Sequence, residues 1–224
     1  MTKKIAQIAG LTIEWLGHST VSISDKKLIY IDPFSEVLKG DEVKADFVIS
    51  THGHRDHFDV NAINKLSKDS TYVIIKSGCD TSNLLSTFIK ELEVNEELTV
   101  EGVNIKAVHA YNIKRFKSPD MPFHPKGFGI GVIITVGGVK FYYAGDTDFI
   151  PPMETLRDEK LDVAFLPIGG TYTMDIDEAA EAALVIQPKI IIPVHYNHLK
   201  GTESDPIEFK WKVEKSIIAK VIIL

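Results

Sequence analysis

The densest group of reactive side chains in the sequence is the segment 50–57, which reads Ser-Thr-His-Gly-His-Arg-Asp-His. It follows the apolar run Phe47-Val48-Ile49, which predicts a buried strand. If the histidines were protonated, they would repel one another. If these side chains were buried without a partner, their polar atoms would lack hydrogen bonds. Neutral imidazole and carboxylate are natural ligands of divalent cations. The segment therefore predicts a metal site formed by His52, His54, Asp56 and His57 rather than a polar loop that is histidine-rich by chance.

Three further ligand-type residues follow segments that predict strands. His109 closes the run from Val103 to Val108, Asp146 comes soon after Val139 to Tyr143, and His195 follows Ile190 to Val194. In layered α/β folds, sites are built at strand ends, where the strand fixes the backbone and the loop exposes the side chain. We therefore expect these residues to join the His52 cluster.

Together these motifs resemble those of the metallo-β-lactamase-fold hydrolases. The resemblance rests on His52-x-His54-x-Asp56-His57, His109, Gly145-Asp146-Thr147 and Pro193-Val194-His195. The early segments Trp15 to Thr20 and Ile31-Asp32-Pro33 are similar to those of the branch that includes ascorbate-6-phosphate lactonase. The resemblance covers nearly the whole chain. It implies one domain over residues 1–224, of α/β (α+β) class, folded as a four-layer αββα sandwich.

The resemblance also implies roles for these residues. His52, His54 and His109 would bind one metal ion, and Asp56, His57 and His195 a second. Asp146 would bridge the two ions, so Asp56 and Asp146 would serve catalysis as well as metal binding. The expected reaction is attack by a metal-bridging hydroxide on a small anionic ester, lactone or phosphodiester. Zinc is the expected metal in both positions, with manganese, iron and nickel as alternatives.

Two other histidines compete for roles at the site. His124 lies in a proline-flanked loop, whereas a strand leads directly into His109, so the sequence favours His109 as the ligand. His124 is then expected to touch substrate or donate a proton from a lid, or to be a surface residue. His18 is either a turn histidine bonded to backbone or a group that contacts substrate. Asp32 is a candidate to orient a metal-binding histidine.

The segment from Tyr111 to Lys126 carries a group of cations among aromatic residues and prolines. Such a charge run is usually a solvated face. The functional alternative is a loop over the metals, in which Lys114, Arg115 or Lys126 holds an anionic group of the substrate.

Composition limits the class of partner. The chain has 224 residues and a formal charge of -6, with 31 acidic against 25 basic residues, which argues against a nucleic-acid binder. Cys79 is the lone cysteine, so an internal disulfide is excluded and a reducing cytoplasm is expected. Met1 to Ala6 lacks the sustained apolar core of a leader, and no window is long enough to span a bilayer. The expected partner is a small anionic molecule, and a homo-oligomer is compatible with the sequence.

Two other functions stay open. One is a nuclease-like phosphodiesterase acting on RNA or DNA, which needs a basic groove that the net charge does not indicate. The other is a non-hydrolytic metal-binding or redox protein. A diiron redox protein on this fold is expected to carry a carboxylate in place of His54 and a flavin module, and the sequence has neither.

The elements that must position these residues follow from periodicity and turn signals. Helices are expected over Asn61 to Leu66, Ser82 to Leu92 and Asp177 to Ile186, with Asp59 and either Asp175 or Asp177 as caps. Gly137-Gly138 predicts a two-residue hairpin, and Asp25-Lys26 an earlier one. Strands are expected over Thr12–Leu16, Val21–Ser24, Leu28–Ile31, Phe47–Ile49, Tyr72–Ile75, Val103–Val108, Gly129–Val136, Val139–Tyr143, Val163–Leu166, Ile190–Val194 and Ala219–Ile223.

Overall fold

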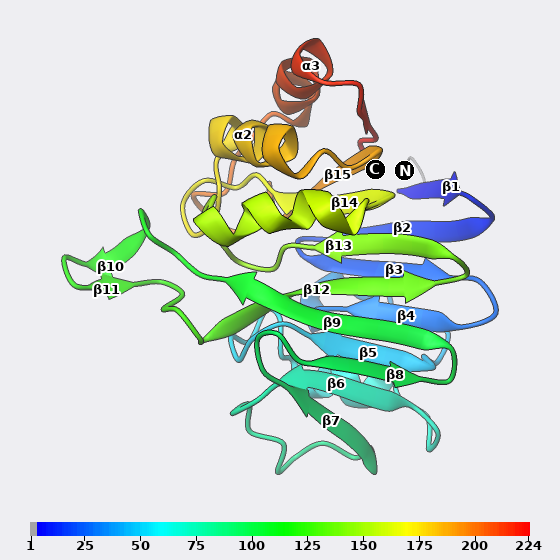
Figure 1. The fold of residues 1–224 in the computed structure, drawn as a ribbon. Coiled ribbons are helices and arrows are strands. Elements are labelled where there is room, and N and C mark those ends of the chain that lie inside the picture. Colours follow the sequence, from blue (N-terminus) through cyan, green and yellow to red (C-terminus); the bar gives the residue numbers. More distant parts are fainter. Residues whose placement is uncertain (1–3) are drawn as a thin grey trace. The chain divides into compact units, whose positions relative to one another are not determined.

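The computed structural model describes residues 4–224, which form two compact units. The first unit runs to Glu93 and includes Leu224, and the second covers Val94–Ile223. In the part of the chain that is described, each unit is built on a seven-stranded sheet (Figure 1). The predicted mixed α/β class is thereby confirmed. The residues Met1 to Lys3 of the segment discussed as a possible leader lie outside the described part.

The sheet of the first unit runs in sequence order from β1 to β7. Strands β1 to β4 pair antiparallel, and β4 to β7 pair parallel. The change to parallel pairing puts the carboxyl ends of β4 and β5 at the same edge, so Asp32 and the histidine segment emerge together. The elements are β1 (Ile5–Ile8), β2 (Leu11–Gly17), β3 (Thr20–Ser24), β4 (Leu28–Ile31), η1 (Ser35–Val37), β5 (Phe47–Ser50), α1 (Val60–Leu66), β6 (Tyr72–Lys76) and β7 (Phe88–Leu92).

Helix α1 covers one face of this sheet. Ile63 and Leu66 are fully buried in a cluster with Val48 and Val73. The helix begins at Asp59, whose side chain accepts hydrogen bonds from the backbone N–H groups of Asn61 and Ala62. This is the predicted N-cap, and it fixes the chain immediately after the histidine segment.

The sheet of the second unit has the order β16-β15-β14-β13-β12-β9-β8. The strands from β13 to β16 pair parallel, and β8, β9, β12 and β13 pair antiparallel. Helix α2 packs against α3 and η2. The elements are β8 (Glu97–Val100), β9 (Val103–Ala110), β10 (Phe116–Ser118), β11 (Met121–Pro122), β12 (Gly129–Val136), β13 (Val139–Tyr143), η2 (Pro151–Glu159), β14 (Val163–Pro167), α2 (Ile176–Ile186), β15 (Ile190–Val194), α3 (Pro206–Ser216) and β16 (Lys220–Val221).

The predicted turns and the alanine-rich helix are confirmed. Gly137 and Gly138 join β12 to β13 with φ values of 58° and 78°, the left-handed backbone that a type I′ hairpin requires. Between β3 and β4, the backbone N–H of Asp25 donates to the carbonyl of Lys27. Helix α2 begins at Asp175, which forms a reciprocal capping box with Glu178.

The helix predicted over Ser82 to Leu92 is wrong. Residues Phe88–Leu92 form β7, which pairs parallel with β6 along its length. The apolar spacing that suggested a helix is satisfied instead by packing of Leu84 and Ile89 against the core beside α1. The sequence predicts neither helix α3 nor the short helices η1 and η2, and it does not predict the strands β1, β7, β8, β10 and β11.

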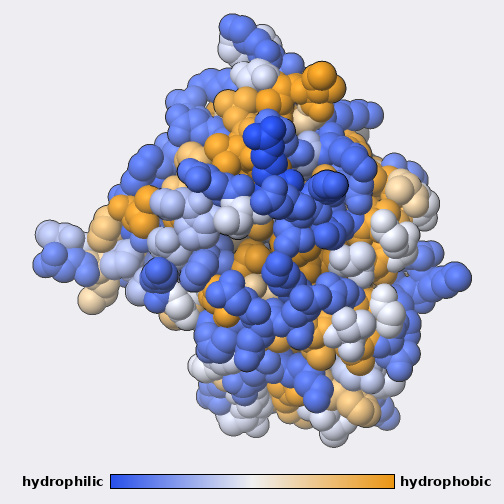
Figure 2. All heavy atoms as spheres, in the orientation of Figure 1, coloured by the Kyte–Doolittle hydropathy of each residue, from blue (hydrophilic) through white to orange (hydrophobic). Residues whose placement is uncertain are grey.

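The second unit also has a short hairpin, β10–β11, which stands apart from its large sheet (Figure 1). Helix α3 leaves Ile207 and Trp211 exposed, and hydrophobic residues gather over the upper helices in Figure 2. Among residues 4–224, no helix has both the length and the apolar character needed to cross a bilayer.

Candidate metal centre

In the first unit, the buried carboxylate of Asp32 organises the histidine segment. It lies just past β4, and one oxygen accepts from His57 Nδ1 at 2.7 Å, with both side chains fully buried. The same carboxylate accepts from the backbone N–H and the hydroxyl of Thr51, both at 2.8 Å. Asp32 has a left-handed φ of 46°, a conformation that non-glycine residues rarely adopt. The suggestion that Asp32 orients a histidine of the segment agrees with this geometry.

These contacts assign the protons on two imidazole rings. An ionised carboxylate only accepts, so His57 Nδ1 carries a proton and donates it to Asp32. Because the Thr51 hydroxyl donates to Asp32, it accepts from His52 Nδ1 at 3.1 Å. His52 Nε2 then lies 3.1 Å from His54 Nδ1. On both His52 and His57, Nδ1 is thus held by a neighbouring side chain, and Nε2 is the ring atom available to bind a cation.

His18 and Asp56 form a second part of this cluster. His18 Nε2 lies 2.9 Å from Asp56 Oδ2, which is 3.4 Å from His57 Nε2. Ligand atoms of these three residues all lie within 4.8 Å of one another. The His18 ring thus contacts a carboxylate, while its carbonyl accepts from the Trp15 indole at 2.8 Å.

In the second unit, Asp146 is the centre of a buried group. Its Oδ2 atom lies 3.2 Å from His124 Nε2 and 3.2 Å from His195 Nε2. All three residues are buried, with at most 5% of Asp146 exposed. His195 leaves β15 with a left-handed φ of 55°, and Gly169 lies against its carbonyl so closely that a Cβ there would clash. The glycine therefore permits the close approach that holds His195 in place.

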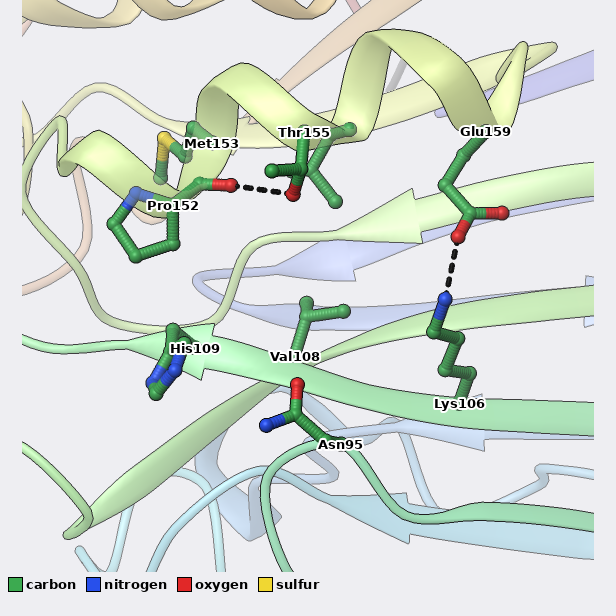
Figure 3. Close-up of a pocket in the computed structure, with 9 residues that line it drawn as sticks. Asn95, Lys106, Val108, His109, Pro152, Met153, Thr155 and Glu159 are labelled. Atoms are coloured by element: carbon green, nitrogen blue, oxygen red, sulfur yellow. Dashed lines mark hydrogen bonds and ion pairs between the residues drawn. The ribbon is translucent and has the colours of Figure 1, made fainter.

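His109 lies near the end of β9 in the second unit. It lines a cavity of about 90 Å³ together with the strand residue Lys106 and the η2 residues Met153, Thr155 and Glu159 (Figure 3). Burial, reinforced by the charge of Lys126, lowers the pKa of His109 below its ordinary value. Its Nδ1 atom has no hydrogen-bond partner among the described residues. The histidine that this unit brings beside Asp146 and His195 is therefore His124, whereas His109 lines the cavity beside η2.

Sequence reasoning missed Asn112, which fixes His124. Asn112 Oδ1 accepts from His124 Nδ1 at 2.7 Å and from the His124 backbone N–H at 2.9 Å. The amide nitrogen donates to Asp148 Oδ1 and to the Tyr172 carbonyl, both at 3.0 Å. No local pattern marks Asn112, because its partners lie far away in the sequence.

Two of the cations considered for substrate binding are already paired. Arg115 contacts Asp148 at 3.0 Å and Asp175 at 3.1 Å, and it also pairs with Glu178. Lys114 Nζ lies 2.7 Å from Glu178. Lys117 and Lys126 are exposed, and each lies over an aromatic ring, Phe123 at 5.8 Å and Tyr111 at 5.6 Å. The segment is thus partly a structural ion-pair network.

The donor atoms of both units suit divalent metal ions. Each unit presents imidazole nitrogens and carboxylate oxygens on buried or half-buried residues that other side chains hold in place. Rings this close, such as His52 and His57 with centroids 4.1 Å apart, would repel if both were protonated. Neutral imidazoles whose Nδ1 atoms are hydrogen-bonded are the usual form of histidine ligands.

Comparison with known proteins places this chain among metal-dependent enzymes in sequence and in fold. A profile described as "Beta-lactamase superfamily domain" matches residues 12–195. A UPF0173 metal-dependent hydrolase of Methanosarcina mazei is 32% identical, over 97% of this chain and 96% of that protein. One from Pelotomaculum thermopropionicum is 35% identical, over 96% of each.

Solved structures agree with the sequence comparison. A crystal structure of a protein from Parabacteroides distasonis is similar with a TM-score of 0.81 and 34% identity, covering 95% of this chain and 92% of that one. Igni18, a metallo hydrolase of Ignicoccus hospitalis, has a TM-score of 0.77 and 28% identity, covering 96% and 94%.

Proposed function

Because the chain belongs to the β-lactamase superfamily and to its UPF0173 metal-dependent hydrolases, we propose that it is a hydrolase that uses two divalent metal ions. The observation that carries the proposal is the buried Asp146 carboxylate with the Nε2 atoms of His124 and His195 both at 3.2 Å. A carboxylate oxygen and two imidazole nitrogens in mutual contact are a ligand set for zinc or a similar ion.

We propose as ligands of these ions the residues that the resemblance names, with one change. The family profile supports this, since it covers both sets of residues as one domain. His124 takes the place that the resemblance assigned to His109, because His124 rather than His109 lies beside Asp146. The proposed ligands are His52, His54, Asp56, His57, His124, Asp146 and His195.

When bound, the two ions would activate water and polarise the group to be cleaved. The protein residues hold the ligand atoms and move the proton. The carboxylate of Asp56 keeps solvent access, with 23% of its side chain exposed, and His18 is fully buried beside it. We propose that Asp56 Oδ2 accepts the proton of the attacking water and that His18 Nε2 stabilises the resulting carboxyl group before the proton passes to the leaving group.

The substrate we propose is a small anionic ester, lactone or phosphodiester. Lys114 and Arg115 are occupied by carboxylates, which leaves Lys126 as the exposed cation two residues from His124. Its Nζ atom lies over the Tyr111 ring. An exposed ammonium group beside a proposed ligand can hold a negative charge of the substrate.

Lys126→Ala tests this part of the proposal, with Lys117→Ala as the matched control because that lysine is also exposed and also lies over a ring. We expect Lys126→Ala to raise KM for an anionic substrate about tenfold, the loss of one charge-assisted contact. KM for an uncharged ester should stay the same, and Lys117→Ala should change neither value. Equal effects of the two variants would contradict the assignment of Lys126.

The hydrolase proposal itself is tested with protein stripped by a chelator and reloaded separately with zinc, manganese, iron or nickel. A panel of phosphodiester, phosphomonoester, lactone and thioester substrates should show turnover that depends on added metal. Asp146→Asn, which keeps the shape of the side chain, should abolish that turnover. Activity that is unchanged by metal removal would overturn the proposal.

A further inference from the structure

We infer that Asn112 is a positioning residue, which fixes the proton and the direction of the His124 ring and closes the loop that carries it. The inference rests on the proposed role of His124 as a metal ligand. It concerns how an uncharged side chain holds that ligand in place.

The hydrogen-bond network determines which way the Asn112 amide points. Its nitrogen faces the Asp148 carboxylate and the Tyr172 carbonyl, each at 3.0 Å, and both partners can only accept. Its oxygen faces the backbone N–H of His124 at 2.9 Å, which can only donate. A flipped amide would bring donor against donor and acceptor against acceptor. The oxygen therefore lies toward the ring.

The orientation of the Asn112 amide determines that the Nδ1 atom of His124 carries a proton. The ring nitrogen Nδ1 lies 2.7 Å from the amide oxygen, so it must donate and therefore carries the proton. The other ring nitrogen, Nε2, lies 3.2 Å from Asp146 Oδ2 and is the ring atom left to bind a cation. His124 is 2% exposed and Asn112 5% exposed, so water does not compete readily for these contacts.

Asn112 also closes the loop that runs to His124. Its backbone N–H donates to the His124 carbonyl at 2.8 Å, while its side chain accepts from the His124 backbone. The loop between them contains the β10–β11 hairpin. A backbone contact and a side-chain contact thus both join Asn112 to His124, which lies twelve positions later in the sequence.

Asp148 fixes the Asn112 side chain that makes these contacts. It is fully buried and accepts from the Asn112 amide, from the backbone N–H groups of Ile113 and Lys114, and from the Arg115 guanidinium. Asp148 therefore fixes the Asn112 amide on the side away from His124. In the first unit, Asp32 is fixed in a similar way by its contacts with Thr51 and His57. The difference is charge: a carboxylate orients His57, whereas a neutral amide orients His124.

Asn112→Ala and Asn112→Asp separate positioning from simple stabilisation. Both variants lose the amide donors to Asp148 and Tyr172, and only the aspartate keeps an acceptor for His124 Nδ1. Asn112→Asp also places a carboxylate beside Asp148, so it should be at least as destabilised as Asn112→Ala. Asn104→Ala is the control, because Asn104 on β9 also bonds two side chains, Glu97 and Thr99.

Two readouts are needed, the zinc dissociation constant from chelator competition and the side-chain ¹⁵N shifts of His124 in metal-free protein. Asn112→Ala should weaken zinc binding about 10- to 100-fold, and Asn112→Asp and Asn104→Ala by much less. In the wild-type protein, the shifts should show the proton on Nδ1, and Asn112→Ala should lose that preference.

The inference is overturned if the wild-type His124 carries its proton on Nε2, a result that does not depend on any variant folding. It is also overturned if zinc affinity follows thermal stability, with Asn112→Asp as weak as Asn112→Ala. A protein that loses zinc with His124→Ala but not with Asn112→Ala overturns this inference alone. A protein that binds no divalent metal overturns the proposed function.

Discussion

At the scale of single residues, the same device recurs on three histidine rings. The Nδ1 atoms of His57, His52 and His124 are bonded to Asp32, Thr51 and Asn112, at 2.7, 3.1 and 2.7 Å. Each contact occupies Nδ1 and leaves Nε2 as the ring atom available to bind a cation. A histidine used only for packing has no need of a fixed tautomer. The repetition of this contact in both units is a strong physical argument for metal binding.

The first prediction separates His124 from His109. His124→Ala is expected to lower bound metal by about one equivalent and to lower kcat by more than 100-fold, because it removes a proposed ligand. His109→Ala is expected to keep its metal, since His109 lines the cavity beside η2. Elemental analysis and steady-state kinetics of the two variants measure both effects. Loss of metal from His109→Ala with full retention in His124→Ala would restore the assignment that the sequence favoured.

The candidate site residues could be predicted from the sequence where they directly follow a strand. His52, His57, Asp146 and His195 each follow a strand whose apolar pattern is plain, so their positions could be anticipated. His124 could not, because its place depends on a loop closed by Asn112 across twelve positions of chain. His109 satisfied the strand-end rule better and was preferred for that reason.

At the scale of elements, regular strands were predictable and ambiguous apolar segments were not. The predicted strands Leu28–Ile31, Gly129–Val136, Val139–Tyr143 and Ile190–Val194 have the bounds that the structure shows. The segment that ends in β7 has apolar residues at helical spacing, yet pairing with β6 decides its conformation. Tertiary context overrides a local period when an open strand edge is available.

The second prediction concerns how η2 is held on its sheet. Hydrogen bonds and charge from Lys106, acting against burial and joined by Lys140, hold the pKa of Glu159 below its ordinary value. A lowered folded-state pKa gives stability that is present above the unfolded pKa and is lost as pH falls through the folded one. Glu159→Gln should therefore destabilise the protein at pH 7, by about 0.5–1 kcal/mol for a pair of partly exposed contacts.

The measurement is urea unfolding of both proteins from pH 7 down to about pH 3, below the ordinary pKa of a glutamate. The difference between wild type and Glu159→Gln should shrink toward zero over that range. Glu154→Gln, an exposed residue on the same helix, is the control and should show little difference at any pH. A difference that stayed constant with pH would show that the charge of Glu159 is not responsible.

At the scale of the whole molecule, charge limits the substrate. The chain carries 31 acidic and 25 basic residues, and two of the cations near the candidate site are paired with carboxylates. An extended nucleic acid needs a continuous cationic surface, and its affinity falls steeply with salt.

The third prediction is that structured RNA and duplex DNA are poor substrates. At about 150 mM salt, where electrostatic contacts are screened over roughly 8 Å, binding should be undetectable in a gel-shift assay at micromolar protein. Small phosphodiesters or lactones should be cleaved in the same buffer. Efficient cleavage of a long duplex, with binding that weakens sharply as salt rises, would favour the nuclease alternative.

The central claim is that the chain binds two divalent metal ions through the proposed ligands, among them His52 and Asp146. The direct measurement is the metal content, by elemental analysis, of wild type, His52→Ala and Asp146→Ala purified without chelator. His52 belongs to the first unit and Asp146 to the second. We predict close to two equivalents in the wild type and a clear loss in each variant, since either change removes a proposed ligand. Wild-type metal content in either folded variant would contradict the account.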